Sequence, residues 1–523
     1  MSARALGSQI QTAVARRVSV DARALAAFRV GVGALLLADL LLRARHLKAF
    51  YTDQGVLPRA VLAEQYPTFA AFSLHALSGA AWFQVVLFAV AGVAALALLI
   101  GYRTTLATVV SLVLLVSLHA RNPVVLNGGD SLFRQLLFWS VFLPLGTRWS
   151  VDARHRQAAN EQSTPSGASA ATQADRTSSK EGEVAGQSGG PADHWTALAP
   201  RVTSVASAAL LVQVVLVYVV NAVLKLRGDA WLSGDAVRVV FALDQFTVFL
   251  GDALAQYPAV LEVASHVWLV LLVCSPLLLV VTGWRRAVLA GLFASVHLGM
   301  LLTMQLGLFP LISMVALVPF LPPVVWDWVS VPSVALLDDL ADALPAFADH
   351  SLPEQLYQWA GTVVPAALAC LLVVALAWNA ASLGFVTIPD SVNPEPGNER
   401  PDYRWNMFAP EPLSVDGWVR APGRLASGAQ VDAFHGGAVR WTKPPDVAAT
   451  YPTARWRKYI ANVWRGNGDT LERGFADYLC ARWDASHESD LVNVSVYYVE
   501  EPVRLGAPDP TERVELYSQP CPS

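Results

Sequence analysis

Long apolar runs separated by short polar connectors fill most of the chain before residue 388. A run of about 20 apolar residues can cross a bilayer as a helix. The first run, 24–42, is longer than the apolar core of a secretion signal, so we expect it to be a retained helix. Further runs follow at 80–100, 105–120, 131–145, 202–224, 259–283, 286–304, 308–322 and 357–386. The pattern predicts an all-α polytopic membrane helical bundle. It leaves the status of 308–322 open, and also that of 237–254, which two aspartates interrupt.

The pattern changes after residue 388. Apolar and polar residues alternate in 492–499 and 513–517, which is typical of strands, whereas 453–464 and 469–484 have the spacing of helices. Residues 389–523 are therefore predicted to form a soluble α+β domain. Of the four cysteines, Cys480 and Cys521 lie in this polar region, so they are the pair that could form a disulfide.

A polar segment divides the apolar runs into two groups. Residues 155–195 are rich in Ser, Ala, Gly, Gln, Thr and Glu and cannot bury a core. We therefore predict a disordered linker over 151–200, between membrane helices in 23–150 and membrane helices in 201–388.

Arginines gather at the run ends that alternate to one side of the membrane, and basic flanks favour the cytoplasm. This predicts a multi-pass protein of the cell membrane with a cytoplasmic N-terminus (1–22), a cytoplasmic linker and an extracytoplasmic C-terminal domain. The flanking arginines are Arg16, Arg17, Arg103, Arg148, Arg154, Arg156, Arg285 and Arg286.

Composition supports the membrane class and excludes others. Hydrophobic residues make up 54% of the chain and charged residues 15%, with a mean hydropathy of +0.42. A net charge of −4 without a basic patch argues against nucleic acid as a partner. No C-x-x-C or H-E-x-x-H spacing occurs, so no metal site is predicted.

One lysine is placed where a charge is costly. Only five of the 37 basic residues are lysines, and Lys225 ends the apolar run that begins near 202. Tyr218 and Asn221 precede it at i−7 and i−4, so the three share a helical face. Unlike arginine, a desolvated lysine can lose its proton and act as a base. The alternative is an interfacial anchor whose amine snorkels to water.

A second polar face has the same spacing. Asn127, Asp130 and Arg134 lie at i, i+3 and i+7, near the same membrane surface as Lys225 in the predicted topology. We expect either a shared ligand pocket or an ion pair of Asp130, with Lys225 or Arg134, that only stabilises helix packing.

Other ionisable residues within apolar runs should face protein or a cavity. Arg29 and His119 are kept as candidate binding residues for this reason. Asp39 is ten residues from Arg29, about 15 Å along a helix, so each needs its own partner. A transporter-like proton relay through Arg29, Asp39, Glu262 and His266 would predict an internal repeat, and none is evident.

Three motifs in order resemble the HTTM family, the prokaryotic relatives of vitamin K-dependent gamma-carboxylase. They are Lys225-Leu-x-Gly228-x-x-Trp231-Leu-x-Gly234, Arg121-Asn-Pro-x-x-Leu-Asn127-Gly-Gly-Asp130, and Trp405-Asn-Met-Phe408-Ala-Pro410-x-Pro412 followed by Asp416-Gly-Trp418. The similarity covers roughly residues 20–325 and 400–465.

The resemblance implies that Lys225 is the base that deprotonates a reduced quinone, with Trp231 in the binding site and Asp130 near a position where the carboxylase has a histidine. It implies a quinone- or lipid-binding cavity near Lys225, quinol-dependent carboxylase-like chemistry and a protein or peptide substrate. The alternative is a non-catalytic lipid- or quinone-binding envelope membrane protein.

Overall fold

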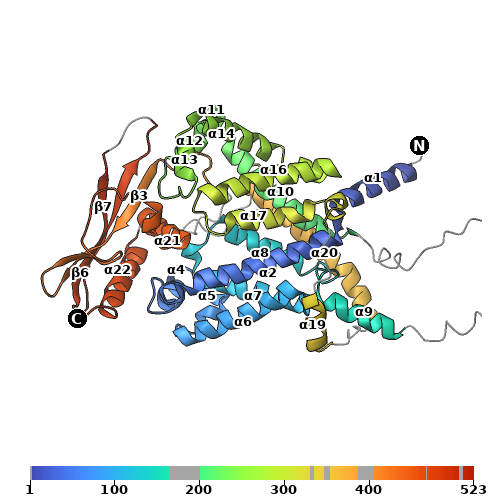
Figure 1. Ribbon diagram of the computed structural model, residues 1–523, viewed down its shortest axis with the longest axis horizontal. Coiled ribbons are helices and arrows are strands. Elements are labelled where there is room, and N and C mark those ends of the chain that lie inside the picture. The colour runs from blue at the N-terminus through green and yellow to red at the C-terminus, as the bar shows by residue number, and fades with distance from the viewer. Residues whose placement is uncertain are drawn as a thin grey trace, which may run out of the picture.

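The computed structural model describes residues 3–163, 201–329, 335–346, 354–386, 406–466, 468–505 and 510–522. A bundle of helices carries the C-terminal region at one end, while α1 (Ala3–Val18) and α9 (Val151–Ser163) lie at the opposite end (Figure 1). We call residues 406–522 the C-terminal α+β region.

Six helices among the described residues are long and apolar enough to cross a membrane. By helix length and composition, this confirms the predicted helical bundle. They are α2 (Ala22–Ala44), α6 (Ala81–Ile100), α7 (Thr104–Arg121), α10 (Val205–Lys225), α16 (Trp284–Thr303) and α20 (Glu354–Ser382). Shorter helices with apolar stretches are α8 (Gly128–Ser140), α14 (Pro258–Val273) and α17 (Phe309–Leu317). The connecting helices are α3 (Leu47–Tyr51), α4 (Arg59–Gln65), α5 (Pro67–Ala71), α11 (Asp229–Ser233), α12 (Ala236–Phe241), α13 (Gly251–Ala255), α15 (Leu277–Val280), α18 (Pro323–Trp326) and α19 (Ala335–Ala343).

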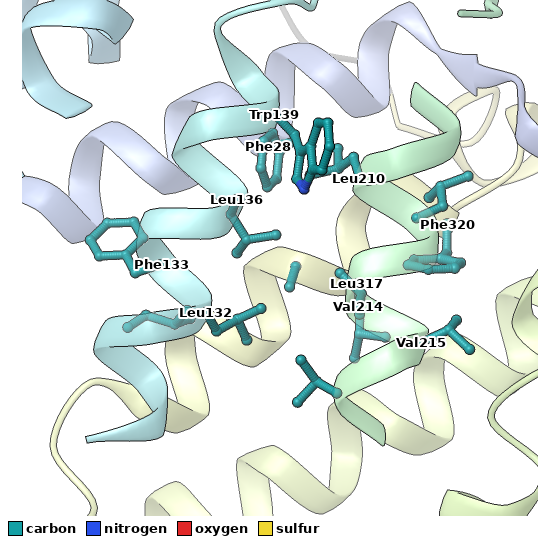
Figure 2. Packing of buried hydrophobic residues seen from close by; sticks show 14 of the residues in the cluster. Phe28, Leu132, Phe133, Leu136, Trp139, Leu210, Val214, Val215, Leu317 and Phe320 are labelled. Atoms are coloured by element: carbon teal, nitrogen blue, oxygen red, sulfur yellow. The ribbon is translucent and has the colours of Figure 1, made fainter. Parts of the chain in front are cut away.

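The main core lies where α2, α8, α10 and α17 meet (Figure 2). Phe28, Leu136 and Leu210 are fully buried there and Leu317 nearly so. Because large apolar side chains interdigitate across four helices, this core fixes the direction of α10 and therefore the position of Lys225 at its end.

Neither ambiguous run forms a helix long enough to cross a membrane. Residues 237–254 form most of α12 and the first turn of α13, joined by a loop whose Asp244 and Gln245 N–H groups donate to the Asp416 carboxylate. The loop is thus tied to the C-terminal α+β region. Residues 308–322 form α17 and a 3-10 turn, Val318–Phe320, that contains Pro319.

The predicted linker is wrong at its start, because residues 151–163 form helix α9. Its Asp152 carboxylate accepts the N–H groups of Arg103 and Thr104, and so caps the first turn of α7. Arg154 pairs with Asp338 of α19 at 3.0 Å. These contacts hold a polar helix that has no apolar core of its own. Residues 164–200 lie outside the described residues.

The C-terminal α+β region contains a five-stranded antiparallel sheet, in the order β3-β6-β4-β5 with β7 also paired to β6. The strands are β3 (Val415–Arg420), β4 (Pro422–Leu425), β5 (Gln430–Asp432), β6 (Leu491–Pro502) and β7 (Glu512–Pro520). Helices α21 (Ala454–Arg465) and α22 (Asp469–Asp484) belong to it, and a two-residue pair, β1 (Val20–Asp21) with β2 (Arg201–Val202), lies in the bundle. The two helices and the two longest strands match the sequence prediction.

The Cys480–Cys521 disulfide joins α22 to the residue after β7, and the two cysteines are 41 positions apart in the sequence. Closing a loop of this length removes unfolded-state entropy. We predict that Cys521→Ser lowers the free energy of unfolding of this region by about 2–4 kcal/mol, measured by denaturant titration of the detergent-purified protein. Cys370→Ser, at a free and exposed cysteine of α20, is the control. Equal stability of the two variants would contradict the prediction.

Candidate functional site

A cavity of about 540 Å³ lies where the bundle meets the C-terminal α+β region. Its walls come from α8, α10, α12, α14, α16 and α17 of the bundle, and from residues 406–413 and α21 of the C-terminal α+β region. Most of the lining is apolar or aromatic, and a few polar groups converge on it. This size and composition are typical of a site for a small organic molecule, for which roughly 300–1,000 Å³ is usual.

Lys225 reaches the cavity from the last turn of α10 and is only 2% exposed. Its Nζ donates to the carbonyl oxygens of Met407 at 2.9 Å and Phe408 at 3.3 Å. The same nitrogen lies 3.5 Å from the ring centroid of Trp231, whose Nε1 donates to Phe408 at 2.7 Å. Carbonyl dipoles and an aromatic face therefore replace water around the amine.

Gly228 allows this approach, and Gly234 ends helix α11. A Cβ at Gly228 would lie 1.9 Å from the carbonyl oxygen of Pro410, so only glycine lets Pro410 approach the start of α11 this closely. Gly234 has φ +92° and packs against His266 of α14. The lysine-glycine-tryptophan motif and the Met-Phe-Ala-Pro motif, far apart in sequence, thus touch each other at the cavity.

Tyr218 and Asn221 also line the cavity, as their spacing with Lys225 predicts. The Tyr218 side chain is 6% exposed, and its hydroxyl has no hydrogen-bond partner among the described residues. Its ring packs against Phe293 and His297, with centroids 4.5 and 5.9 Å away. The phenol is therefore a polar group in an aromatic wall, able to donate or accept one hydrogen bond.

Asn127 lines the cavity but Asp130, one turn later, does not. The two form a capping box at the start of α8, in which each side chain accepts the other's backbone N–H. The Asp130 carboxylate pairs with Arg43 at 2.7 Å and with Arg455 at 3.0 Å. The sequence predicted either a ligand pocket shared with Lys225 or an ion pair of Asp130 with Lys225 or Arg134, and neither alternative named Arg43 or Arg455.

Arg43 and Arg455 also pair with Asp39, at 2.7 and 2.6 Å. We call the four residues, Asp39, Arg43, Asp130 and Arg455, the ion-pair cluster. Its charges balance, which is what burial of such groups requires. Although burial lowers the pKa of Arg455, the carboxylates of Asp130 and Asp39 raise it above its ordinary value. The cluster joins α2, α8 and α21, so the charge of Asp130 is used in holding the C-terminal α+β region on the bundle.

His119 and Arg134 belong to the surroundings of the ion-pair cluster rather than to the cavity. The His119 imidazole lies between the guanidinium groups of Arg43, at 2.8 Å, and Arg134, at 2.7 Å. Tyr51 completes the arrangement by accepting a hydrogen bond from Arg43 at 2.7 Å. Of the second polar face, only Asn127 shares a pocket with Lys225; Asp130 and Arg134 do not line the cavity, and neither does the candidate binding residue His119.

Arg29 lies at another place in the fold. Its guanidinium donates to the carbonyl oxygens of Leu98 and Leu99 at the end of α6, and of Trp149, at 2.6–2.7 Å. It thus satisfies helix-end carbonyls and is not among the cavity residues. The prediction that Arg29 binds a ligand is therefore wrong, and its role is structural. As predicted, Arg29 and Asp39 have different partners.

Three arginines of the cavity and the ion-pair cluster, Arg43, Arg455 and Arg457, were not predicted from the sequence. Arg43 follows Asp39 at i+4, a spacing that could have been read as an ion pair, but Arg455 and Arg457 look like surface residues of an amphipathic helix. Arg457 is buried, donates to Gln245 and Gln305, and lies 4.0 Å from the ring centroid of Phe246.

Three carboxylates, Asp244, Asp416 and Glu501, lie within 4.8 Å of one another where the α12–α13 loop meets the sheet. Their oxygens could hold a cation, but Lys443 already forms ion pairs with Asp244 and Glu501. The buried Asp416 accepts the two loop N–H groups. This group is a second connection between the C-terminal α+β region and the bundle.

The cavity can therefore bind an apolar ring or chain and offer it an amine, a phenol and amides. Lys225 has no carboxylate partner in the described part of the chain, so its amine could exchange a proton with a bound hydroxyl group. Comparison with models of known protein families, with curated proteins and with solved structures finds no match.

Burial raises the pKa of Asp416 from 3.8 to about 6, and the nearby charge of Asp244 adds to this. A carboxyl group whose pKa is higher in the folded state binds more protons there, so stability falls as pH rises from about 4 to about 6. We predict that the stability of the wild type relative to Asp416→Asn falls by about 3 kcal/mol over this range, since each pKa unit is worth about 1.4 kcal/mol. Denaturant titrations at several pH values measure it.

Asp490→Asn, at an exposed carboxylate of the same region, is the control and should leave the pH profile unchanged. Identical pH profiles for the wild type and Asp416→Asn would contradict the prediction.

Proposed function

We propose that this protein is a membrane protein that binds a quinone or a similar lipid in the cavity, with the head of the ligand at Lys225. The observation that carries the proposal is a buried lysine without a carboxylate partner in the described residues, at the polar end of an apolar cavity. An ionisable group placed at such cost within an apolar segment is most often functional.

The donor set fits a quinone or quinol. Nζ of Lys225 and the Tyr218 hydroxyl can each bond a ring oxygen, and Trp231, Trp268 and Phe309 offer aromatic faces. Glu411 is the one acidic residue among those lining the cavity in the described chain, against the basic Lys225, Arg457, Lys458 and Arg465. A neutral or anionic head is therefore favoured over a cationic one.

We propose further that the N-terminus is cytoplasmic and the C-terminal α+β region extracytoplasmic, in the cell membrane. Support comes from Arg16 and Arg17 of α1 and Arg154 and Arg156 of α9, because these two helices lie at the end of the bundle away from that region (Figure 1). Arg286 donates to the Arg17 carbonyl, and Arg17 to that of Val280. A disulfide in the C-terminal α+β region agrees with an oxidising compartment.

A second candidate is quinol-dependent, carboxylase-like catalysis, as the resemblance to the HTTM family suggests. What favours it is the contact between two of the resembling motifs at Lys225, since Phe408 accepts from both Lys225 and Trp231. Lys225 would take a proton at Nζ from a ring hydroxyl, and the Met407 and Phe408 carbonyls would stabilise the resulting ammonium. A bound quinol would supply the reducing equivalents. Asp130, held in the ion-pair cluster, would position α8 and α21 without touching the ligand.

Lys225→Met tests the binding proposal. Loss of a hydrogen-bonding amine at the ligand head should weaken binding of menaquinone about 10-fold or more, measured as quenching of tryptophan fluorescence in detergent. Lys48→Met removes an exposed lysine from α3, at the same end of the bundle, and should leave binding unchanged. If the wild type binds no menaquinone and co-purifies with no isoprenoid lipid by mass spectrometry, the proposal is wrong.

Catalysis is tested by incorporation of labelled carbon dioxide into glutamate-containing peptides in the presence of menaquinol and oxygen. If Lys225 is the base, Lys225→Met should reduce incorporation by about 100-fold or more. Incorporation that survives this substitution would rule out Lys225 as the base. Binding without any incorporation by the wild type would support the non-catalytic alternative.

A further inference from the structure

One wall of the cavity reaches the outside of the bundle. Ala264 and Val267 of α14 and Val296, Gly299 and Met300 of α16 line it. Val267 is also 49% exposed and Gly299 is exposed, so the same residues face both the cavity and the surroundings of the bundle. A Cβ placed on Gly299 would meet no atom within 4 Å. The wall is therefore thin at Val267 and Gly299.

The surface around this thin wall is apolar. Val263 and Val270 of α14 are 61% and 60% exposed, and Leu298 and Leu302 of α16 are each 43% exposed. Because α16 is one of the helices long and apolar enough to span a membrane, an exposed apolar band of this kind belongs against lipid chains. The outer side of the thin wall therefore faces lipid rather than water.

We propose that the cavity opens sideways into the bilayer between α14 and α16, and that its ligand is an amphipathic lipid whose tail passes between Val267 and Gly299. This rests on the proposed function and adds the class of ligand and its route of entry. The polar head lies at Lys225 and Tyr218, and the tail stays among lipid chains outside. The cavity then needs to hold only the head of the ligand, whatever the length of the tail. The ligand can also bind without leaving the membrane.

Helix α16 offers a matched pair of substitutions. Gly299→Phe places a ring at the thin wall. Gly291→Phe places the same ring eight residues earlier, at an exposed glycine that also has no atom within 4 Å of a Cβ and does not line the cavity. Gly299→Ala adds only a methyl group, which cannot fill the gap, and reports any general effect of losing the glycine.

The probes are menaquinone, which carries a long isoprenoid tail, and menadione, the same ring without the tail. Binding to the purified protein in detergent is followed by quenching of tryptophan fluorescence. We expect Gly299→Phe to weaken menaquinone binding about 10-fold or more relative to menadione binding, with Gly291→Phe and Gly299→Ala behaving as the wild type.

The outcomes separate the two proposals. If the wild type binds both probes and Gly299→Phe weakens neither, or weakens both equally, the sideways opening is wrong while the binding function stands. If the wild type binds neither probe, the proposed function fails and this inference with it. Equal effects of Gly299→Phe and Gly291→Phe on menaquinone would also overturn the opening, because the effect would then not depend on the thin wall.

Discussion

The contact of Lys225 with the Met407 and Phe408 carbonyls is the constraint on which the rest of the site depends. An amine at the end of an apolar helix normally reaches water, but here the 407–410 segment covers it. Gly228 makes room for that segment, and Trp231 covers another side of the amine. The cavity is closed at its polar end only because a part of the chain 182 residues away in sequence lies over the lysine.

Such a cover needs a firmly held C-terminal α+β region, and two connections supply this. On one side Arg455 of α21 enters the ion-pair cluster with Asp39 and Asp130. On the other, Asp416 of β3 accepts backbone N–H groups from the α12–α13 loop. Both connections use buried charges, which are specific in geometry because an unpaired partner would be costly. The cavity is lined by residues of α8, α21 and the α12–α13 loop, the elements that these connections hold, so its shape depends on both.

The sequence predicted the parts of this structure that have a local signal. The places of the apolar helices, the helix-strand pattern after residue 450, the face shared by Tyr218, Asn221 and Lys225, and the choice of Cys480 and Cys521 as the pair that could form a disulfide follow from spacing or composition. The run 259–283, predicted as one segment, instead forms two helices, α14 and α15, with Pro276 between them. It failed where the partner is distant. Asp130 is drawn to Arg43 and Arg455 rather than to Lys225, and Arg29 to helix-end carbonyls, because tertiary packing decides which buried charges meet. Helix α9 was missed since its stability comes from the Asp152 cap and from α19, not from an apolar face.

The central claim is that Lys225 binds the head of a membrane lipid such as a quinone. A cryo-EM structure of the protein in lipid nanodiscs with menaquinone tests it most directly. We predict ring density within hydrogen-bonding distance of Nζ of Lys225, continuous with tail density between α14 and α16. Ring density bound elsewhere, with the cavity beside Lys225 filled only by water or by side chains, would contradict it.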